Sequence, residues 1–162
     1  FYAEQVPMYF TGSWMGGSIV TDAEKPDNFA VAPIPVVNSK NASVTDFMGG
    51  GSDTLMVSAN TKNKDLAAAA AFEITRGVSK HAYLSGAGIP AWTVDYDASS
   101  VPALTRQVAD IAGKATSYTL WFDTLMSSDD AGEYLTLLQS LFAGDLKPEE
   151  FAASMDKQLS KK

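Results

Sequence analysis

The stretch MGGGSDTLMVSANTKNKDLAAAAAFEITRGV, residues 48–78, carries the strongest structural signals in the chain. Leu55-Met56-Val57 predicts a strand, and a polar turn after it leads into a helix. Four apolar residues, each four positions after the last, form one stripe on that helix: Leu66, Ala70, Ile74 and Val78. Because alanine gives this face little bulk, we expect the helix to pack closely against a flat partner such as a sheet. The stretch therefore predicts a βα unit.

Capping residues predict where this helix begins and ends. Asn63 is a suitable N-cap, and Asp65 places a negative charge in the first turn. We expect Gly77 to end or loosen the helix, because glycine disfavours helix interiors. Ser79 then caps a short helix over residues 80–84, which stops at the glycines beginning with Gly86.

The pattern of apolar and turn residues in the rest of the chain predicts more helices than strands. Short buried strands are expected at residues 8–11 and 29–33, and residues 38–46 are polar and typical of a loop. Three further helices are expected: residues 101–112, residues 131–143 before Gly144, and a last helix that begins with Pro148.

Composition excludes several classes of protein. The 162 residues, 46% hydrophobic and 19% charged, suit a globular domain, and no run approaches the ~18 apolar residues of a membrane span. With no cysteine, the chain has no disulfide and no thiolate site. A net charge of -7 argues against nucleic-acid binding, and the acidic residues are spread out as on a solvated surface. The N-terminus lacks a signal-peptide pattern and an initiator Met, so we expect a piece of a longer protein.

The sequence offers no catalytic or metal-binding constellation. His81 is the one histidine, and it lacks a neighbouring carboxylate or serine partner. The run from Gly49 to Thr54 fits neither the phosphate-binding loop nor the G-x-S-x-G motif. The adjacent acids Asp129 and Asp130 are better explained as part of a helix start. We therefore expect a protein that is not an enzyme and that binds no metal or cofactor.

Tryptophans beside turns are the one feature that suggests a ligand. Trp14, Trp92 and Trp121 each follow or adjoin a turn or strand end. Sugar rings have apolar faces and rims of hydroxyl groups, so their sites combine flat aromatic rings with carboxylates or main-chain amides. Residues 49–51, all glycine, would let the main chain approach such a ligand closely. The alternative is that each tryptophan belongs to the core.

Five segments in order resemble one protein family. They are PMYFTGSW at 7–14, FAVAPIP at 29–35, GGGSDTLMVSANTKNKDLAAAAAFE at 49–73, the segment 79–91 with its GIPA, and the segment 141–159. Together they are similar to the C-terminal part of the extracellular solute-binding proteins of carbohydrate ABC transporters, the group that includes maltose-binding proteins.

The resemblance implies an α/β fold, the C-terminal part of a two-lobed type II periplasmic-binding-protein fold that is helix-rich with few short strands. Residues 1–35 would give C-terminal-lobe strands and a turn, 36–54 a crossing segment, 55–115 an N-terminal-lobe βα segment, and 116–162 C-terminal-lobe helices. Without the N-terminal half of such a protein, we expect unpaired edges that favour self-association.

The resemblance also implies a ligand site. Trp14 would be a stacking platform of the C-terminal lobe, and Gly49, Gly50 and Gly51 would lie where main-chain amides meet hydroxyls. Trp121 would face the cleft, and Asp123 would accept hydrogen bonds from the sugar. Two positions depart from the family pattern: Gly77 within a helix, and Lys147 in place of a Ser or Thr cap.

The implied function is binding of a sugar or oligosaccharide in an interlobe cleft and its delivery to permease subunits of an ABC importer. The implied location is extracytoplasmic, either periplasmic or lipid-anchored at the outer face of the cell membrane. Two alternatives stay open at this point: a non-enzymatic α/β interaction domain with the tryptophans in its core, and a binding protein for a non-sugar solute.

Overall fold

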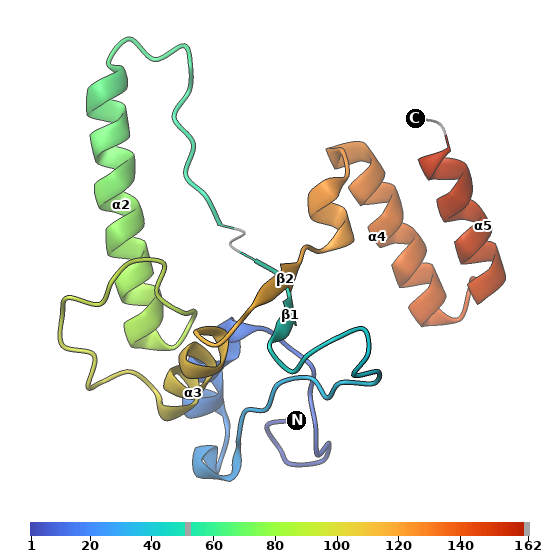
Figure 1. Cartoon of the computed structure of the whole chain (residues 1–162), viewed down its shortest axis with the longest axis horizontal. Helices are drawn as coiled ribbons and strands as arrows, with labels where there is room; N and C mark the ends of the chain where they lie inside the picture. The colour runs from blue at the N-terminus through green and yellow to red at the C-terminus, as the bar shows by residue number, and fades with distance from the viewer. Residues whose placement is uncertain (51–52, 161–162) are drawn as a thin grey trace. The chain divides into compact units, whose positions relative to one another are not determined.

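The computed structural model describes residues 1–50 and 53–160, and most of their regular secondary structure is helical (Figure 1). In chain order the elements are η1 (Ser13–Met15), α1 (Gly16–Asp22), η2 (Pro26–Asn28), β1 (Asp46–Met48), α2 (Lys64–Ser85), α3 (Ala103–Ala112), β2 (Ser117–Thr119), η3 (Phe122–Leu125), α4 (Ser128–Ala143) and α5 (Pro148–Leu159). They form two compact units. The first consists of residues 1–47 and the described part of 51–118, and the second of residues 48–50 and the described part of 119–162.

The strands β1 and β2 pair side by side although they are far apart in the sequence. The main-chain N of Thr116 donates to the carbonyl oxygen of Thr45 (2.9 Å), and further along both strands the N of Gly49 donates to the oxygen of Thr119 (2.8 Å). The bonds advance in the same direction on both strands, so the pair is parallel. A side-chain hydrogen bond also joins the two strands: the Ser117 hydroxyl donates to the Asp46 carboxylate at 2.7 Å.

The core of the first unit lies where α1 and η1 pack against α3. Glycine makes this close approach possible: a Cβ atom on Gly16 would lie 2.1 Å from Oγ1 of Thr105, which is fully buried. Gly17 meets the end of α2 in the same way, and its N donates to the oxygen of Gly86 at 2.9 Å. The hydrophobic residues buried here are few: Ile19, Tyr83, Val101 and Leu104.

A large apolar surface remains exposed. The accessible area is 12069 Å², whereas a compact monomer of 17.2 kDa has roughly 7,800 Å². The exposed hydrophobic side chains come from the N-terminal segment, from α2 and from the segment around β2. The chain therefore buries much less surface than a self-contained domain of its mass.

The helix α2 begins as predicted and ends later than predicted. Asn63 is its N-cap and Asp65 lies in its first turn. The expectation that Gly77 ends or loosens the helix is wrong, since α2 continues to Ser85 and includes the predicted separate helix 80–84. Its end is at Gly86, whose φ of 79° is in the left-handed region that glycine favours. Packing of the last turns against α1 outweighs the propensity of one glycine.

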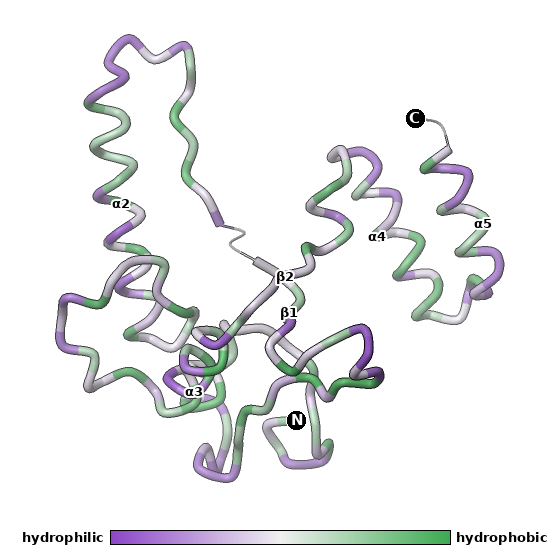
Figure 2. Tube along the Cα trace, in the orientation of Figure 1, coloured by the Kyte–Doolittle hydropathy of each residue, from purple (hydrophilic) through white to green (hydrophobic). Residues whose placement is uncertain are grey.

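The apolar stripe of α2 is exposed, which corrects the expectation that it is the buried side. Leu66 is 70% exposed and Val78 is 63% exposed, and hydrophobic residues recur along the whole helix (Figure 2). The opposite side of α2 instead faces the segment that follows it, where Phe72 contacts Trp92 and Tyr83 is buried. The sheet expected to cover the stripe is absent from the described residues.

The three strands predicted at residues 8–11, 29–33 and 55–57 are also wrong, since each segment is described without strand structure. A strand needs a neighbouring strand to satisfy its main-chain groups. Within the described residues only β1 and β2 supply each other with one. The pattern of these segments is that of strands, but the described residues supply them with no pairing partner.

The second unit is built from the two helices predicted with the clearest signals. Ser127 caps α4 by accepting a hydrogen bond from the N of Asp130, and Gly144 ends it with a φ of 82°. Pro148 begins α5, and the Glu150 carboxylate accepts from the N of Lys147 at 2.9 Å. The two helices lie side by side in antiparallel directions (Figure 1).

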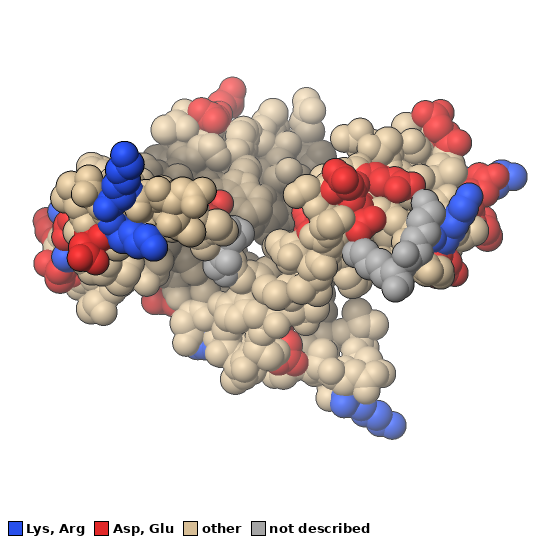
Figure 3. Space-filling model, turned by 90° about the horizontal axis from the view of Figure 1, so that it is seen from above, with Lys and Arg blue, Asp and Glu red and all other residues tan. Residues whose placement is uncertain are grey.

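Charged residues are dispersed, as the sequence predicts. Figure 3 shows Lys and Arg side chains scattered over the face in view among acidic ones. This distribution offers no concentrated basic surface on the face shown, in keeping with the net charge of -7.

Substitution of Gly16 tests the close packing of α1 on α3. We expect Gly16→Ala to lower the free energy of unfolding by about 1–3 kcal/mol, because its Cβ would overlap Oγ1 of Thr105. The matched control is Gly132→Ala in α4, where a Cβ meets nothing within 4 Å. That change should raise stability by up to ~1 kcal/mol through helix propensity. Urea unfolding followed by circular dichroism measures both, and equal effects of the two substitutions would contradict the packing.

The strand pair makes a second prediction, about the pKa of Asp46. The hydrogen bond from Ser117 and then the one from the N of Ser43 lower the pKa of this carboxyl below its ordinary 3.8. A lowered pKa means that the carboxylate stabilises the fold above its unfolded-state pKa. This contribution is lost as the pH falls through the lowered value.

We therefore expect Ser117→Ala to raise the pKa of Asp46 toward 3.8, measured by carboxyl ¹³C NMR titration. Asp97 is the control, because a main-chain hydrogen bond from Ser99 lowers its pKa independently of the strand pair. An unchanged Asp46 pKa in the variant would show that the side-chain pairing does not persist in solution.

Candidate functional site

The parallel strands bring two of the predicted site segments together. β1 is followed by Gly49 and Gly50, and β2 by Leu120 and Trp121. Because both strands run in the same direction, both segments leave the pair at the same end. The hydrogen bond from the N of Gly49 to the oxygen of Thr119 fixes them next to each other.

The indole of Trp121 lies against the main chain at Gly49. A Cβ atom on Gly49 would be 3.3 Å from Nε1 and 3.7 Å from Cε2 of the indole. Gly49 is buried and has a φ of 117°, a conformation that side chains rarely adopt. Gly50 follows with a φ of 156° and lies beside the Leu120 side chain. Both glycines are required here, by conformation and by the closeness of their neighbours.

Trp121 is accessible and its position is fixed locally. Its side chain is 38% exposed, and the hydroxyl of Thr124 donates to its carbonyl oxygen at 2.6 Å. Asp123 follows in η3 and is half-buried. The arrangement offers a flat aromatic surface and, two residues along the chain, a carboxylate that accepts hydrogen bonds.

Trp14 lies in the first unit, whereas the other described site residues belong to the second. Its ring covers Gly12, because a Cβ there would be 2.1 Å from Cζ3 of the indole. Trp14 is 59% exposed, so within this chain it is no core residue. Gly51 lies outside the described residues. The structure thus brings Gly49, Gly50, Trp121 and Asp123 into one region, and the role of all six residues in binding stays a prediction.

Sequence reasoning missed the residues that hold this region in place. Thr119 supplies the carbonyl oxygen that binds Gly49, and nothing in the sequence indicates this partner. Thr124 was detectable, because a threonine hydroxyl commonly donates to the main-chain carbonyl oxygen three residues earlier, which here is that of Trp121. Leu120 carries only the signal of a strand residue.

Other kinds of site find little support in the described part of the chain. His81 is exposed there, and the described residues contain no group of three or more His, Cys, Asp or Glu side chains placed to hold a metal ion. Among the same residues, no helix combines the length and the hydropathy needed to cross a membrane.

Comparison with known proteins relates the N-terminal part of the chain to one family. Residues 1–72 match the family model described as bacterial extracellular solute-binding protein. The match includes η1 with Trp14, the strand β1, and the first turns of α2.

A solved structure extends the relationship over nearly the whole chain. It comes from a study titled as biochemical and structural insights into xylan utilization by the thermophilic bacterium Caldanaerobius polysaccharolyticus. The two share 31% sequence identity with a TM-score of 0.81 over 93% of this chain. The chain spans 40% of the length of that structure. No curated protein matched the chain.

These comparisons decide three of the expectations from the sequence. The resemblance to extracellular solute-binding proteins is confirmed, and so is the helix-rich α/β class as part of a periplasmic-binding-protein structure. Since the family consists of binding proteins, the expectation that the chain is not an enzyme is confirmed as well. The assignment of the segments 1–35, 36–54, 55–115 and 116–162 to lobes stays a prediction.

Proposed function

We propose that the protein containing this chain binds a sugar or oligosaccharide between two lobes and delivers it to the permease subunits of an ABC importer. The family is one of extracellular solute-binding proteins, and the solved structure that resembles the chain comes from a study of xylan utilization. Xylose-based oligosaccharides are therefore the first ligands to test.

The observation that most directly supports a sugar is the pairing of Trp121 with Gly49. An indole that lies on a glycine main chain and remains 38% exposed presents a flat apolar surface. Such a surface suits the C–H face of a pyranose ring. The carboxylate of Asp123 and the main-chain amides near Gly50 and Gly51 would then meet the hydroxyl rim.

Trp14 supplies a second platform in this proposal. It is exposed, and its ring position is defined by Gly12, so it is available to a ligand without rearrangement. The proposal includes closure of the two lobes on the ligand, which binding favours when the ligand makes more contacts in the closed state. No covalent step is involved.

The proposal places the protein outside the cytoplasm, either in the periplasm or anchored by a lipid at the outer face of the membrane. This follows from the family description as extracellular. Its partners are the carbohydrate and the membrane permease, and the exposed apolar surface also allows self-association.

The test is a tryptophan-fluorescence titration of the protein as its gene encodes it, with xylobiose, xylotriose, cellobiose and maltose. A saturable change with one class of glycan is expected. If folded protein gives no response to any of them, the sugar assignment fails. A non-sugar solute or an interaction domain then becomes the better explanation.

Truncation of Trp121 tests the site itself. We expect Trp121→Ala to weaken affinity for the identified sugar by about 1–3 kcal/mol, measured by calorimetry, because a stacked aromatic contact is lost. Phe142→Ala is the matched control, since this aromatic residue of the same unit is 90% exposed and distant in sequence from the site. Equal losses in the two variants would remove Trp121 from the site.

A further inference from the structure

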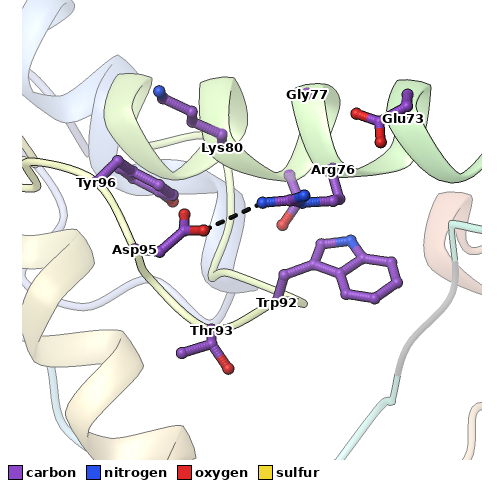
Figure 4. Close-up of a pocket in the computed structure, with 9 residues that line it drawn as sticks. Glu73, Arg76, Gly77, Lys80, Trp92, Thr93, Asp95 and Tyr96 are labelled. Atoms are coloured by element: carbon purple, nitrogen blue, oxygen red, sulfur yellow. Dashed lines mark hydrogen bonds and ion pairs between the residues drawn. The ribbon is translucent and has the colours of Figure 1, made fainter.

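A hollow lies on the first unit, between α2 and the segment that follows this helix (Figure 4). Its volume is about 270 Å³. Residues of the helix and of the segment that follows it line this hollow, among them Arg76, Gly77, Lys80, Trp92, Asp95 and Tyr96. None of these residues belongs to the candidate site around Trp121.

Trp92 gives this hollow a fixed aromatic wall. Its ring meets Phe72 edge to face at a centroid distance of 5.0 Å, with an angle of 76°. The residue before it is held too, because the N of Ala91 donates to the Ser79 hydroxyl at 2.9 Å. The indole is nevertheless 41% exposed. A ring that is both held and accessible is suited to stacking against a ligand.

The hollow is lined by both positively and negatively charged side chains. Arg76 and Asp95 form an ion pair at 3.1 Å, and Lys80 lies over the ring of Tyr96 at 4.8 Å. An anionic ligand would meet the carboxylates of Asp95 and Glu73, and a cationic one would meet Arg76 and Lys80. A neutral ligand that both donates and accepts hydrogen bonds satisfies the set, and sugar hydroxyls do both.

From these observations we infer that the hollow is a second carbohydrate-binding site, which takes a single neutral sugar ring stacked on Trp92. It lies within one unit and is formed by residues of this chain alone. It therefore does not depend on the proposed site at Trp121 or on closure of two lobes. Such a site would let the protein hold a chain end of a polysaccharide apart from the transported ligand.

The experiment follows the indole N–H signals of tryptophan in ¹H–¹⁵N NMR spectra of the protein as its gene encodes it. Trp92→Phe assigns the Trp92 signal, and the titrants are methyl β-D-xylopyranoside, methyl α-D-glucopyranoside and inorganic phosphate. We expect a saturable shift of the Trp92 signal with at least one glycoside and none with phosphate. Asp95→Ala should weaken the affinity fitted from the Trp92 signal by about fivefold or more, because it removes a carboxylate of the lining that accepts hydrogen bonds from sugar hydroxyls.

Asp97→Ala is the matched control, since it removes an exposed carboxylate two residues away that is not part of the lining. The affinity fitted from the Trp92 signal of this variant should equal that of the unsubstituted protein. The inference is overturned if the Trp92 signal responds to no glycoside in folded protein, if it responds to phosphate instead, or if Asp95→Ala leaves the fitted affinity unchanged. Shifts confined to the Trp14 and Trp121 signals would overturn it while leaving the proposed function standing.

Discussion

The parallel pairing of β1 with β2 is the constraint on which the candidate site depends. Short as they are, these strands join parts of the chain that are far apart in sequence, through main-chain bonds at Thr45 and Gly49 and the side-chain bond between Asp46 and Ser117. The chain also passes from the first unit to the second within these two strands. The hydrogen bond from the N of Gly49 to the oxygen of Thr119, within the second unit, places Trp121 against Gly49.

Glycine allows close contacts at two places in this chain. At Gly16 and at Gly49 the absence of a side chain brings the main chain close to α3 in one case and to an indole in the other. Gly77 differs, because a Cβ there would meet nothing within 4 Å. Its cost in helix propensity is one that the fold tolerates.

The exposed apolar stripe of α2 and the unpaired strand segments have a common explanation. The chain spans 40% of the solved structure that it resembles, and its accessible area is far above that of a compact monomer of its mass. The segment Leu55–Val57 and the stripe from Leu66 to Val78 have the apolar pattern of buried elements. They are nevertheless exposed, because the described residues contain no surface that covers them.

The sequence by itself determined the local structure. Asn63, Gly86, Gly144 and Pro148 mark helix ends as predicted, because capping depends on neighbours along the chain, whereas α4 begins at Ser128, three residues before the predicted start at residue 131. The sequence also singled out Gly49, Trp121 and Trp14 as site candidates. Only the tertiary structure decided which strands pair, that Trp121 lies on Gly49, and that α2 continues through Gly77. These are contacts between distant residues, whose free energy depends on spatial neighbours that local propensity does not encode.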